Sequence, residues 1–432
     1  MAKYKAYPEY KDSGVEWLGQ VPKSWVICRL KNLAVIKNGQ DYKSVQADNG
    51  YPVMGSGGQF MFASKFMYDK PSVLLGRKGT IDKPLYVDVP FWTVDTMYYT
   101  ELNKGVDAKY LYYLALTIQF SRYSTNTALP SMTQEHLSNY KFAIPKVESD
   151  RRKITDFLNH ETAKIDNLIE KQQQLIELLK EKRQAVISHA VTKGLNPNVP
   201  MKDSGVEWLG EVPEHWIVSG FKKYLSSIVD YRGKTPNKID DGILLVTARN
   251  IKKGELDYTL SQEFIAPSDY KEVMSRGLPD IGDVLFTTEA PLGEVANVDR
   301  VDIALAQRII KFKGMISRLN NYYFKYFIMS SSFQQSLNLY SSGSTAQGIK
   351  AERFVYLRKL LPPINEQMQI VDFLDKEISK IDMLVEQQFV MLSLLQERRT
   401  ALISAAVTGK IDVRDWVAHD TQKADKVKET AA

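Results

Sequence analysis

The residues best suited to bind a ligand lie in glycine-bearing loops that combine basic, aromatic and amide side chains. Arg and Lys donate hydrogen bonds to phosphates and to guanine, Asn and Gln match the edge of adenine, and backbone amides at glycine turns bind phosphate oxygens. Such loops predict contacts with double-stranded DNA. The candidates are Tyr42, Lys43, Arg77, Lys78, Thr80, Arg122, Tyr123, Asn126, Tyr231, Arg232, Lys234, Thr235, Arg249, Asn250, Lys252, Ser344, Thr345 and Gln347. Solvated turns have a similar composition, so each residue is a candidate only.

A search for catalytic signatures finds none. The segment "YRGKTP" lacks the first glycine of a phosphate-binding loop, because Ile228 stands at that position. Asp280 and Glu289 are not followed by the lysine that a nuclease would need, and no Asn/Asp-Pro-Pro-Tyr/Phe motif of amino-methyltransferases occurs. The five histidines show no metal-binding spacing. We therefore expect no catalytic residues, no metal site and no cofactor in this chain; an enzyme with an unfamiliar site is the alternative.

Bulk properties indicate a globular, cytoplasmic protein. The 432 residues are 44% hydrophobic and 11% aromatic, enough to fill two or three cores. A net charge of +6 permits a polyanionic partner without requiring one. The single cysteine, Cys28, fits a reducing compartment. Neither a signal peptide nor a membrane-spanning run is present, so we expect no membrane contact.

A fifteen-residue phrase occurs twice in the chain. "KDSGVEWLGQVPKSW" at 11–25 returns as "KDSGVEWLGEVPEHW" at 202–216, with three changes. Both copies keep their glycines, their proline and both tryptophans, among them Trp25 and Trp216. The phrase therefore predicts the same turn and the same aromatic packing at two places, which we call the joints.

A second repeat predicts two long helices. Residues 154–192 and 370–408 are identical at 21 of 39 positions, contain no proline or glycine, and precede Gly194 and Gly409. Their apolar residues step by three and four, which is typical of a coiled-coil seam. We expect pairing through Leu158, Ile165, Leu168, Leu175, Leu179 and Val186 of one helix and Leu374, Ile381, Leu384, Met391, Leu395 and Leu402 of the other. The alternative is an amphipathic helix packed on its own domain.

The order joint, core and helix thus occurs twice. The cores, near 26–150 and 217–365, show strand-like runs and glycine turns but little common sequence. Because the first helix leads to the second core, we expect the second helix to return antiparallel to the first. The predicted fold class is α+β, with two globular mixed α/β domains separated by two long antiparallel coiled-coil helices and a pseudo-two-fold internal repeat.

Over essentially its whole length the chain resembles the specificity subunit of type I restriction-modification systems. The resemblance rests on the repeated "KDSGVEWLG", on "LPPINEQ", on the two "DFL" and "KID" helices, and on the loop phrases "LLGRKGTI" and "LFTTEAPLGEVA". It implies two target-recognition domains that read a bipartite, asymmetric DNA target. The implied division is a first target-recognition domain at 1–150, a spacer helix at 151–194, a linker and second target-recognition domain at 195–365, a second spacer helix at 366–410 and a C-terminal tail at 411–432.

The resemblance also implies partners. Two modification (methyltransferase) subunits, which bind S-adenosylmethionine, would dock around the helices, and restriction subunits that use ATP with Mg can join. The chain itself would be a non-catalytic specificity subunit. A two-armed adaptor whose cores bind protein loops is the rival interpretation; a steep salt dependence of binding would favour DNA, because binding to DNA releases counterions.

Overall fold

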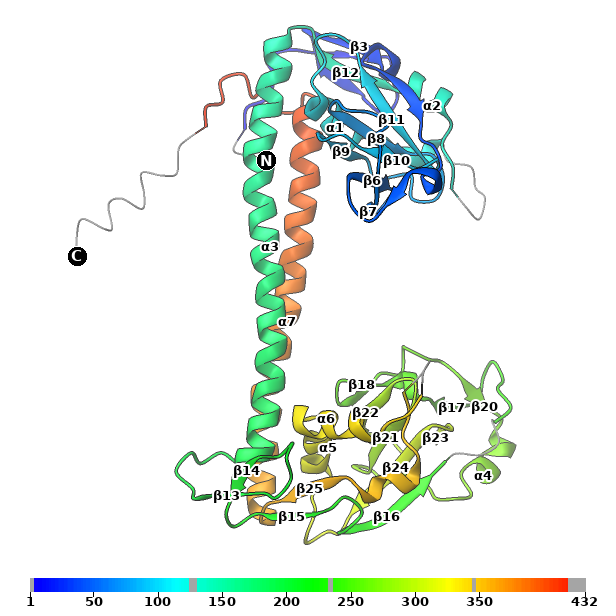
Figure 1. Ribbon diagram of the computed structural model, residues 1–432, viewed down its shortest axis with the longest axis vertical. Coiled ribbons are helices and arrows are strands. Elements are labelled where there is room, and N and C mark those ends of the chain that lie inside the picture. The colour runs from blue at the N-terminus through cyan, green and yellow to red at the C-terminus, as the bar shows by residue number, and fades with distance from the viewer. Residues whose placement is uncertain (1–3, 124–129, 232–235, 344–346, 419–432) are drawn as a thin grey trace, which may run out of the picture. The chain divides into compact units, whose positions relative to one another are not determined.

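The computed structural model describes residues 4–123, 130–231, 236–343 and 347–418. It divides the chain into two compact units (Figure 1). The first unit comprises Met1–Gln173 and Val390–Ala432, and the second unit comprises Gln174–Phe389. Each unit contains one mixed α/β domain and a part of each long helix, so the two are described separately.

Two four-stranded sheets form the domain of the first unit. One sheet has the strand order β4-β11-β8-β9 and the other has the order β10-β6-β7-β5. Neighbouring strands are antiparallel except β10 and β6, which are parallel. The strands are β4 (Ala34–Asn38), β5 (Gln46–Ala47), β6 (Tyr51–Gly55), β7 (Gly58–Ala63), β8 (Ser72–Gly76), β9 (Leu85–Val87), β10 (Trp92–Thr93) and β11 (Met97–Leu102). The apolar run "SVLLG" of β8 is buried along its whole length, as its composition predicts.

The domain of the second unit has a corresponding topology, with one strand fewer in its smaller sheet. Its sheets have the orders β16-β24-β21-β22 and β23-β17-β20, again with one parallel pair, β17 with β23. The strands are β16 (Leu225–Asp230), β17 (Ile243–Val246), β20 (Phe264–Ile265), β21 (Val284–Thr288), β22 (Leu292–Asn297), β23 (Ile303–Leu305) and β24 (Ile309–Gly314). A two-stranded hairpin of β18 (Ile251–Lys252) and β19 (Glu255–Leu256) is added. The two cores are therefore variants of one fold despite their unlike sequences.

One glycine position is common to both domains. Gly50 precedes β6 with φ +129°, and a Cβ atom there would lie 2.4 Å from the carbonyl oxygen of Ala63. Gly242 precedes β17 with φ +147°, and its Cβ would lie 2.4 Å from the carbonyl oxygen of Ile265. Any side chain would clash with the neighbouring strand, so glycine is required at this turn in both domains.

Each domain is fastened to a long helix by a tyrosine on a short helix. On α1 (Ala108–Ala115), the Tyr113 hydroxyl donates to Asn159 Oδ1 at 2.9 Å. On α5 (Asn321–Met329), the Tyr326 hydroxyl donates to Asp375 Oδ1 at 2.6 Å. The acceptors occupy equivalent positions of the two repeated helices. The remaining short α-helices are α2 (Gln134–Asn139), α4 (Tyr270–Val273) and α6 (Ser331–Tyr340).

The joints fold as predicted into the same small hairpin. In the first joint β1 (Tyr10–Asp12) pairs with β2 (Gln20–Pro22), and in the second β13 (Met201–Asp203) pairs with β14 (Glu211–Pro213). Asp12 Oδ1 accepts the amide of Gly14 at 3.0 Å, and the equivalent aspartate repeats this bond at the same distance. Identical local chemistry thus produces identical turns.

The tryptophan that ends each joint packs on the glycine that ends a long helix. Trp25 and Trp216 are each 1% exposed. A Cβ atom on Gly409 would lie 3.2 Å from Trp25 Cη2, and one on Gly194 would lie 3.3 Å from Trp216 Cζ2. Both glycines have positive φ, +74° and +79°, as a helix C-cap requires. After each tryptophan a two-stranded sheet closes the domain, formed by β3 (Trp25–Arg29) with β12 (Lys141–Pro145) and by β15 (Ile217–Gly220) with β25 (Arg358–Leu361).

The two long helices are α3 (Glu148–Lys193) and α7 (Ile364–Val407). They run side by side (Figure 1) and, within each unit, antiparallel. In the first unit Arg399 Nε lies 2.7 Å from Asp166 Oδ1. In the second unit Arg183 Nε lies 2.8 Å from Asp382 Oδ1. These ion pairs join equivalent positions of the repeat, so the predicted antiparallel pairing and α+β fold class are confirmed.

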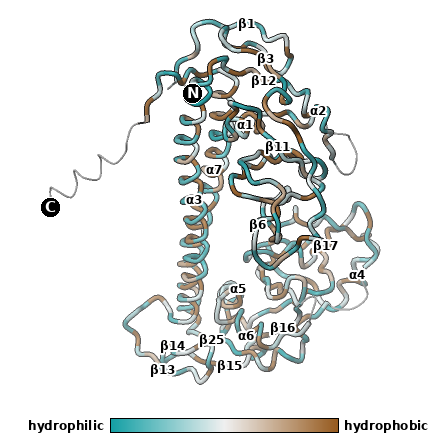
Figure 2. Tube along the Cα trace, turned by 45° about the horizontal axis from the view of Figure 1, so that its top comes forward, coloured by the Kyte–Doolittle hydropathy of each residue, from teal (hydrophilic) through white to brown (hydrophobic). Residues whose placement is uncertain are grey.

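The predicted seam residues are well covered at the ends of the helices and exposed in the middle. Leu158, Ile165, Leu374 and Ile381 are buried, and Leu179, Val186, Leu395 and Leu402 are half-buried. Four predicted seam residues are instead 40–48% exposed, namely Leu168, Leu175, Leu384 and Met391. The residue that follows each of them is less exposed: Ile176 is 3% exposed, and Ile169, Val385 and Leu392 are half-buried. Figure 2 shows hydrophilic and hydrophobic residues alternating along α3. Because adjacent leucine and isoleucine residues fit the apolar spacing equally well, the spacing alone does not identify the buried one.

Candidate nucleic-acid interface

Three chain segments meet at one edge of the first domain. The Arg77 amide, in the loop after β8, donates to the carbonyl of Thr96 at 2.9 Å, and the Met132 amide donates to the carbonyl of Arg77 at 3.0 Å. Lys78 and Thr80 of this loop are exposed. We call residues 77–80, 95–96 and 130–132 the loop edge of the first domain.

The second domain builds an equivalent edge. The Thr288 amide donates to the carbonyl of Arg308 at 2.9 Å, and the Ile349 amide donates to the carbonyl of Thr288 at 2.9 Å. The backbone of Glu289 forms an isolated β-bridge with Gly348, and the backbone of Lys78 forms the corresponding bridge with Ser131. We call residues 288–291, 307–308 and 347–349 the loop edge of the second domain.

The two loop edges differ in their side chains although their backbones correspond. Lys78 of the first edge occupies the position of Glu289 in the second, and Thr96 occupies that of Arg308. The Arg77 side chain is half-buried and its Nη1 donates to the carbonyl of Asp95 at 3.2 Å. Equivalent frameworks thus present different donors and acceptors to a ligand.

The structure brings some of the predicted residues together at these edges and leaves others apart. Arg77, Lys78 and Thr80 share the first edge, and the exposed Gln347 lies at the second. Exposed Arg249 follows β17, and exposed Lys252 lies in the β18–β19 hairpin. Tyr42 and Lys43 belong to a separate segment before β5, where the Tyr42 ring packs edge-on against Phe60 with centroids 5.2 Å apart.

Two predicted contacts in the second domain are wrong because the side chains are internal. Tyr231 is 7% exposed, and its hydroxyl donates to the carbonyl of Gly277 at 2.7 Å; burial raises its pKa. Asn250 is fully buried, and its Nδ2 donates to the carbonyls of Asp257 at 3.0 Å and Ser261 at 2.8 Å. Both side chains hold loops together and cannot reach a nucleic acid.

Arg122 and Tyr123 have partners within the first domain, and their contact with DNA stays a prediction. Arg122 Nη1 and Nη2 donate to the carboxylate of Glu16 at 3.0 and 3.2 Å, and the guanidinium lies 5.6 Å from the Trp17 ring centroid. The hydrogen bond from Arg122 lowers the pKa of Glu16. Tyr123 packs edge-on against Trp17 as well. These residues clamp the domain to its joint. Asn126, Arg232, Lys234, Thr235, Ser344 and Thr345 lie outside the described residues.

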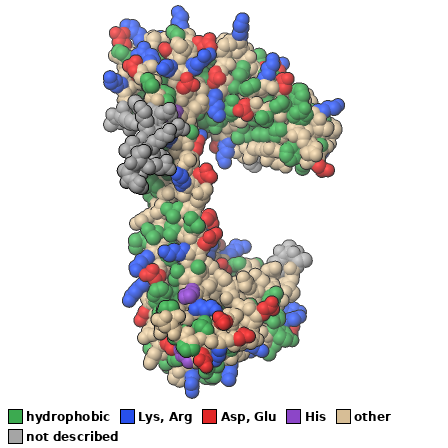
Figure 3. Space-filling model, turned by 60° about the vertical axis from the view of Figure 1, so that its left-hand side comes forward, with side chains coloured by type: hydrophobic (Ala, Val, Ile, Leu, Met, Phe, Trp, Pro, Cys, Tyr) green, Lys and Arg blue, Asp and Glu red, His purple; other side chains and the backbone are tan. Residues whose placement is uncertain are grey.

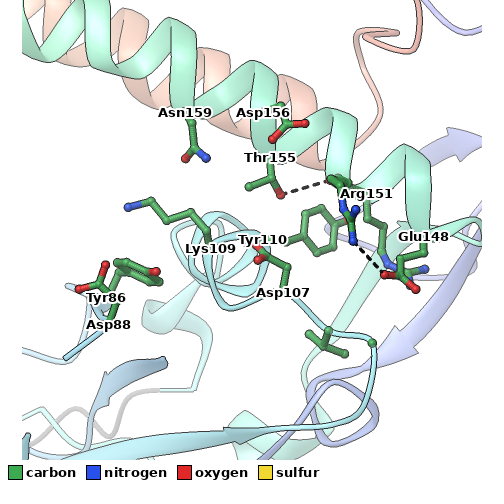
Figure 4. Close-up of a pocket in the computed structure, with 13 residues that line it drawn as sticks. Tyr86, Asp88, Asp107, Lys109, Tyr110, Glu148, Arg151, Thr155, Asp156 and Asn159 are labelled. Atoms are coloured by element: carbon green, nitrogen blue, oxygen red, sulfur yellow. Dashed lines mark hydrogen bonds and ion pairs between the residues drawn. The ribbon is translucent and has the colours of Figure 1, made fainter. Parts of the chain in front are cut away.

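A pocket of about 740 Å³ lies between α1 and the N-terminal turns of α3 (Figure 4). Its cations are Lys109, Arg151 and Arg152, and its carboxylates are Asp88, Asp107, Glu148 and Asp156. Arg152 pairs with Glu148 at 3.5 Å. Because the opposite charges are balanced, this pocket does not favour a polyanion over other ligands.

Within the described parts of the chain, no three His, Cys, Asp or Glu side chains are placed to hold a metal ion. No helix there is both long and apolar enough to cross a bilayer.

Comparison with known families decides the assignment. Residues 22–178 and 228–388 each match the type I restriction modification DNA specificity domain, and together they make up well over half of the chain. The chain belongs to this family. The resemblance inferred from the sequence is therefore confirmed, and a type I specificity protein is a DNA-recognition component and not a catalytic subunit.

Individual relatives extend the match over most of the chain. The type I restriction enzyme MjaVIII specificity subunit of Methanocaldococcus jannaschii is 23% identical over 353 residues, covering 79% of this chain and 77% of the relative. The EcoBI specificity subunit of Escherichia coli is 22% identical over 445 residues, covering 95% and 91%. A chain from a structure of the complex assembly and conformational transition of the type I R-M system has a TM-score of 0.67 at 14% identity, with 90% of this chain and 99% of that chain covered. This likeness supports the fold.

Sequence reasoning missed several polar residues of the second specificity domain. Arg308, Gln307 and Lys238 line a pocket together with the predicted Arg249, and Glu289 pairs with Arg308. The available signal was weak: "AQRII" places two polar residues directly before the apolar strand β24. Loop composition favours glycine-rich stretches as binding sites, and the segment before β24 contains no glycine.

Proposed function

We propose that this specificity subunit reads a bipartite, asymmetric double-stranded DNA target, one half with each domain. The observation that carries this proposal is the pair of loop edges, which share a backbone framework but differ at Lys78 against Glu289 and at Thr96 against Arg308. Unlike side chains on a common framework recognise unlike base sequences, because base edges differ in their donors and acceptors. The two half-sites should therefore be dissimilar.

The division of labour along the chain follows from the repeat. We propose that the first target-recognition domain spans 1–150 and the second, with its linker, spans 195–365. The segments 151–194 and 366–410 would be spacer helices, followed by a tail from 411. We propose further that the protein acts in the cytoplasm, where it meets chromosomal DNA.

We also propose that the long helices scaffold two modification subunits. In the first unit Leu168, Met391 and Leu394 are 47–53% exposed, and in the second unit the equivalent Leu384, Leu175 and Leu178 are 40–61% exposed. Exposed apolar clusters mark binding surfaces. Figure 3 shows hydrophobic side chains among the charged ones on the long helices. Two copies of one partner would meet equivalent apolar residues in each unit. The partners would supply S-adenosylmethionine-dependent methylation, and restriction subunits would supply ATP- and Mg-dependent activity.

The decisive experiment is to express the chain with a modification subunit and to map methylated positions genome-wide. We expect one discrete motif made of two dissimilar half-sites separated by an unread gap of fixed length. A continuous motif, a palindrome, or no methylation would contradict the proposal. Binding of the assembled complex to this target should also weaken steeply with salt, with a slope of about −0.9 per phosphate contact on a log–log plot.

A further inference from the structure

The second specificity domain contains a pocket beside its loop edge. Its volume is about 260 Å³, and it is bounded by the turn after β17, the β21–β22 turn and the β23–β24 turn. The cations that line it, among the residues that the structure describes, are Lys238, Arg249 and Arg308. Among the described residues, none of the side chains that line it is aromatic, so the pocket is not built to stack an extruded base. Its donors are suited instead to the edge of a paired base.

Arg308 combines an ion pair of its side chain with a strained backbone conformation. Its Nε lies 2.8 Å from Glu289 Oε1, and the two side chains are 48% and 45% exposed. Its backbone has φ +78°, a conformation that is costly for a residue with a Cβ atom. The amide and the Oγ1 of Thr288 both donate to its carbonyl, at 2.9 and 3.2 Å, and fix this conformation.

The ion pair leaves one face of the guanidinium available. Glu289 occupies Nε, and within the described residues no acceptor is bonded to the terminal nitrogens Nη1 and Nη2 of Arg308. Two parallel N–H donors match a ligand with two adjacent acceptors. In the major groove guanine offers O6 and N7, whereas adenine places an amino group beside its N7.

The neighbouring carboxylate argues for a base and against a phosphate. A phosphate oxygen that approached Arg308 would also approach the negative charge of Glu289, which is 2.8 Å from the guanidinium. Guanine is neutral and suffers no such repulsion. Lys238 also has a carboxylate partner, because it pairs with Glu263 at 2.6 Å. Arg249 differs from both, since it forms no ion pair with any described residue. Arg249 is thus the better phosphate ligand of the pocket.

We propose that Arg308 reads a guanine in the half-site of the second domain, with Glu289 as the residue that positions it. This inference rests on the proposed function and adds a base to it. At the equivalent place in the first domain stands Thr96, whose short side chain cannot form the same bidentate contact. The first half-site is therefore not read in this way.

The test uses the full chain in complex with its modification subunit. Methylation rates are measured on duplexes that carry the wild-type target with each base of the second half-site varied in turn. For Arg308→Gln we expect a loss of about tenfold or more on the guanine target and a shift towards adenine at that one position, because Gln matches adenine. Glu289→Gln should reduce the discrimination while guanine stays preferred. Arg308→Lys keeps the charge but lacks the fork, so guanine selectivity should fall; this variant decides the question if Arg308→Gln does not assemble.

Arg300→Gln is the matched control. Arg300 is an exposed arginine of the same domain, 47% exposed and paired with Asp302, but it does not line the pocket. It should leave the base preference unchanged. An unchanged motif in Arg308→Gln would overturn the inference, and so would an equal loss on all bases accompanied by a salt slope lower by about 1, which indicates a phosphate contact. A wild-type complex that methylates no bipartite target would overturn the proposed function together with this inference.

Discussion

A lysine of the second domain is buried in the sheet that closes it. Lys359 on β25 is fully buried, and its Nζ donates to the carbonyls of Gly220, Phe221 and Lys223. It also lies 5.8 Å from the Phe221 ring centroid. The ammonium ties the turn after β15 to the sheet that closes the domain. Burial lowers the pKa of Lys359 to about 7.

This pKa predicts a pH dependence of stability. The pKa in the folded state, about 7, is below the value of about 10.4 for an unfolded lysine, so between these values the unfolded chain binds more protons. The cost of burying the charge is complete below pH 7 and disappears as the pH rises towards 10.4. The difference in unfolding free energy, wild type minus Lys359→Met, should therefore increase from pH 7 to pH 10 by up to about 1.4 kcal/mol per pH unit.

Urea denaturation at pH 7, 8 and 9 measures this difference. Lys222→Met is the matched control, because Lys222 is an exposed lysine in the adjacent turn. Its difference from wild type should stay constant across the same pH values. A constant difference for Lys359→Met as well would show that the lysine is equally charged in both states.

At the same scale, the candidate site could be predicted only in part from the sequence. Composition identified exposed loop residues such as Lys78 and Arg249. It could not show that the Asn250 side chain donates its hydrogen bonds to carbonyls 7 and 11 residues away. Nor could it show that Arg308 forms an ion pair with Glu289, which is distant in the chain. These roles depend on pairing between segments that are distant in the chain, and local composition does not encode such pairing.

Among the elements, α3 and α7 define the scaffold. Their existence and their C-terminal ends followed from two repeated, glycine-free stretches, but in the middle of the helices the predicted seam residues are more exposed than the residues that follow them. A helix of 3.6 residues per turn drifts against a pattern of threes and fours, so adjacent apolar residues cannot be ranked without the partner helix. The ion pairs Asp166–Arg399 and Arg183–Asp382 resolve the register.

Charge reversal tests this register. Arg399 Nε and Nη2 donate to Asp166 Oδ1 and Oδ2 at 2.7 and 3.2 Å, and Arg399 is 27% exposed. Asp166→Arg or Arg399→Asp alone should each lower the unfolding free energy by about 1 kcal/mol, and the double variant should recover most of this loss. Thermal unfolding of the four proteins gives the coupling energy. The pair Glu177–Lys180, which lies within one helix, is the control and should couple by only about 0.3 kcal/mol. Strictly additive losses for Asp166 and Arg399 would contradict the register.

A second prediction at this scale concerns the exposed apolar residues of the helices. Leu168→Glu with Met391→Glu should remove one docking surface, in the first unit, so that native mass spectrometry finds one modification subunit per chain and not two. Leu384→Glu with Leu175→Glu should remove the other. Ile316→Glu is the control, because Ile316 is 93% exposed and belongs to the loop after β24, not to either long helix. Retention of two partners by both double variants would exclude this surface.

At the level of the whole molecule, the repeats predicted the scaffold and left the domains undetermined. Both joints were repeated almost letter for letter, and they fold alike. The cores share a strand order that the sequence did not reveal, because strand order is set by long-range pairing. Gly50 and Gly242 occupy the same position of the common fold. One glycine among many in the sequence cannot identify a topology, however.

This organisation predicts that a domain can be exchanged as a unit. Residues 26–144 begin after Trp25 and end before Pro145, and these two residues are register partners in the sheet that closes the first domain. An exchange between these two residues therefore keeps the joint and the start of α3 intact. Replacing 26–144 by the corresponding segment of a relative with another target should change the first half-site and leave the second half-site and the gap unchanged. Methylation mapping of the chimaera measures all three, and the reciprocal exchange of 218–360, inside the pair Ile217–Leu361, should change only the second half-site. If either chimaera altered both half-sites, the domains would not read DNA independently, and the repeat would serve assembly alone.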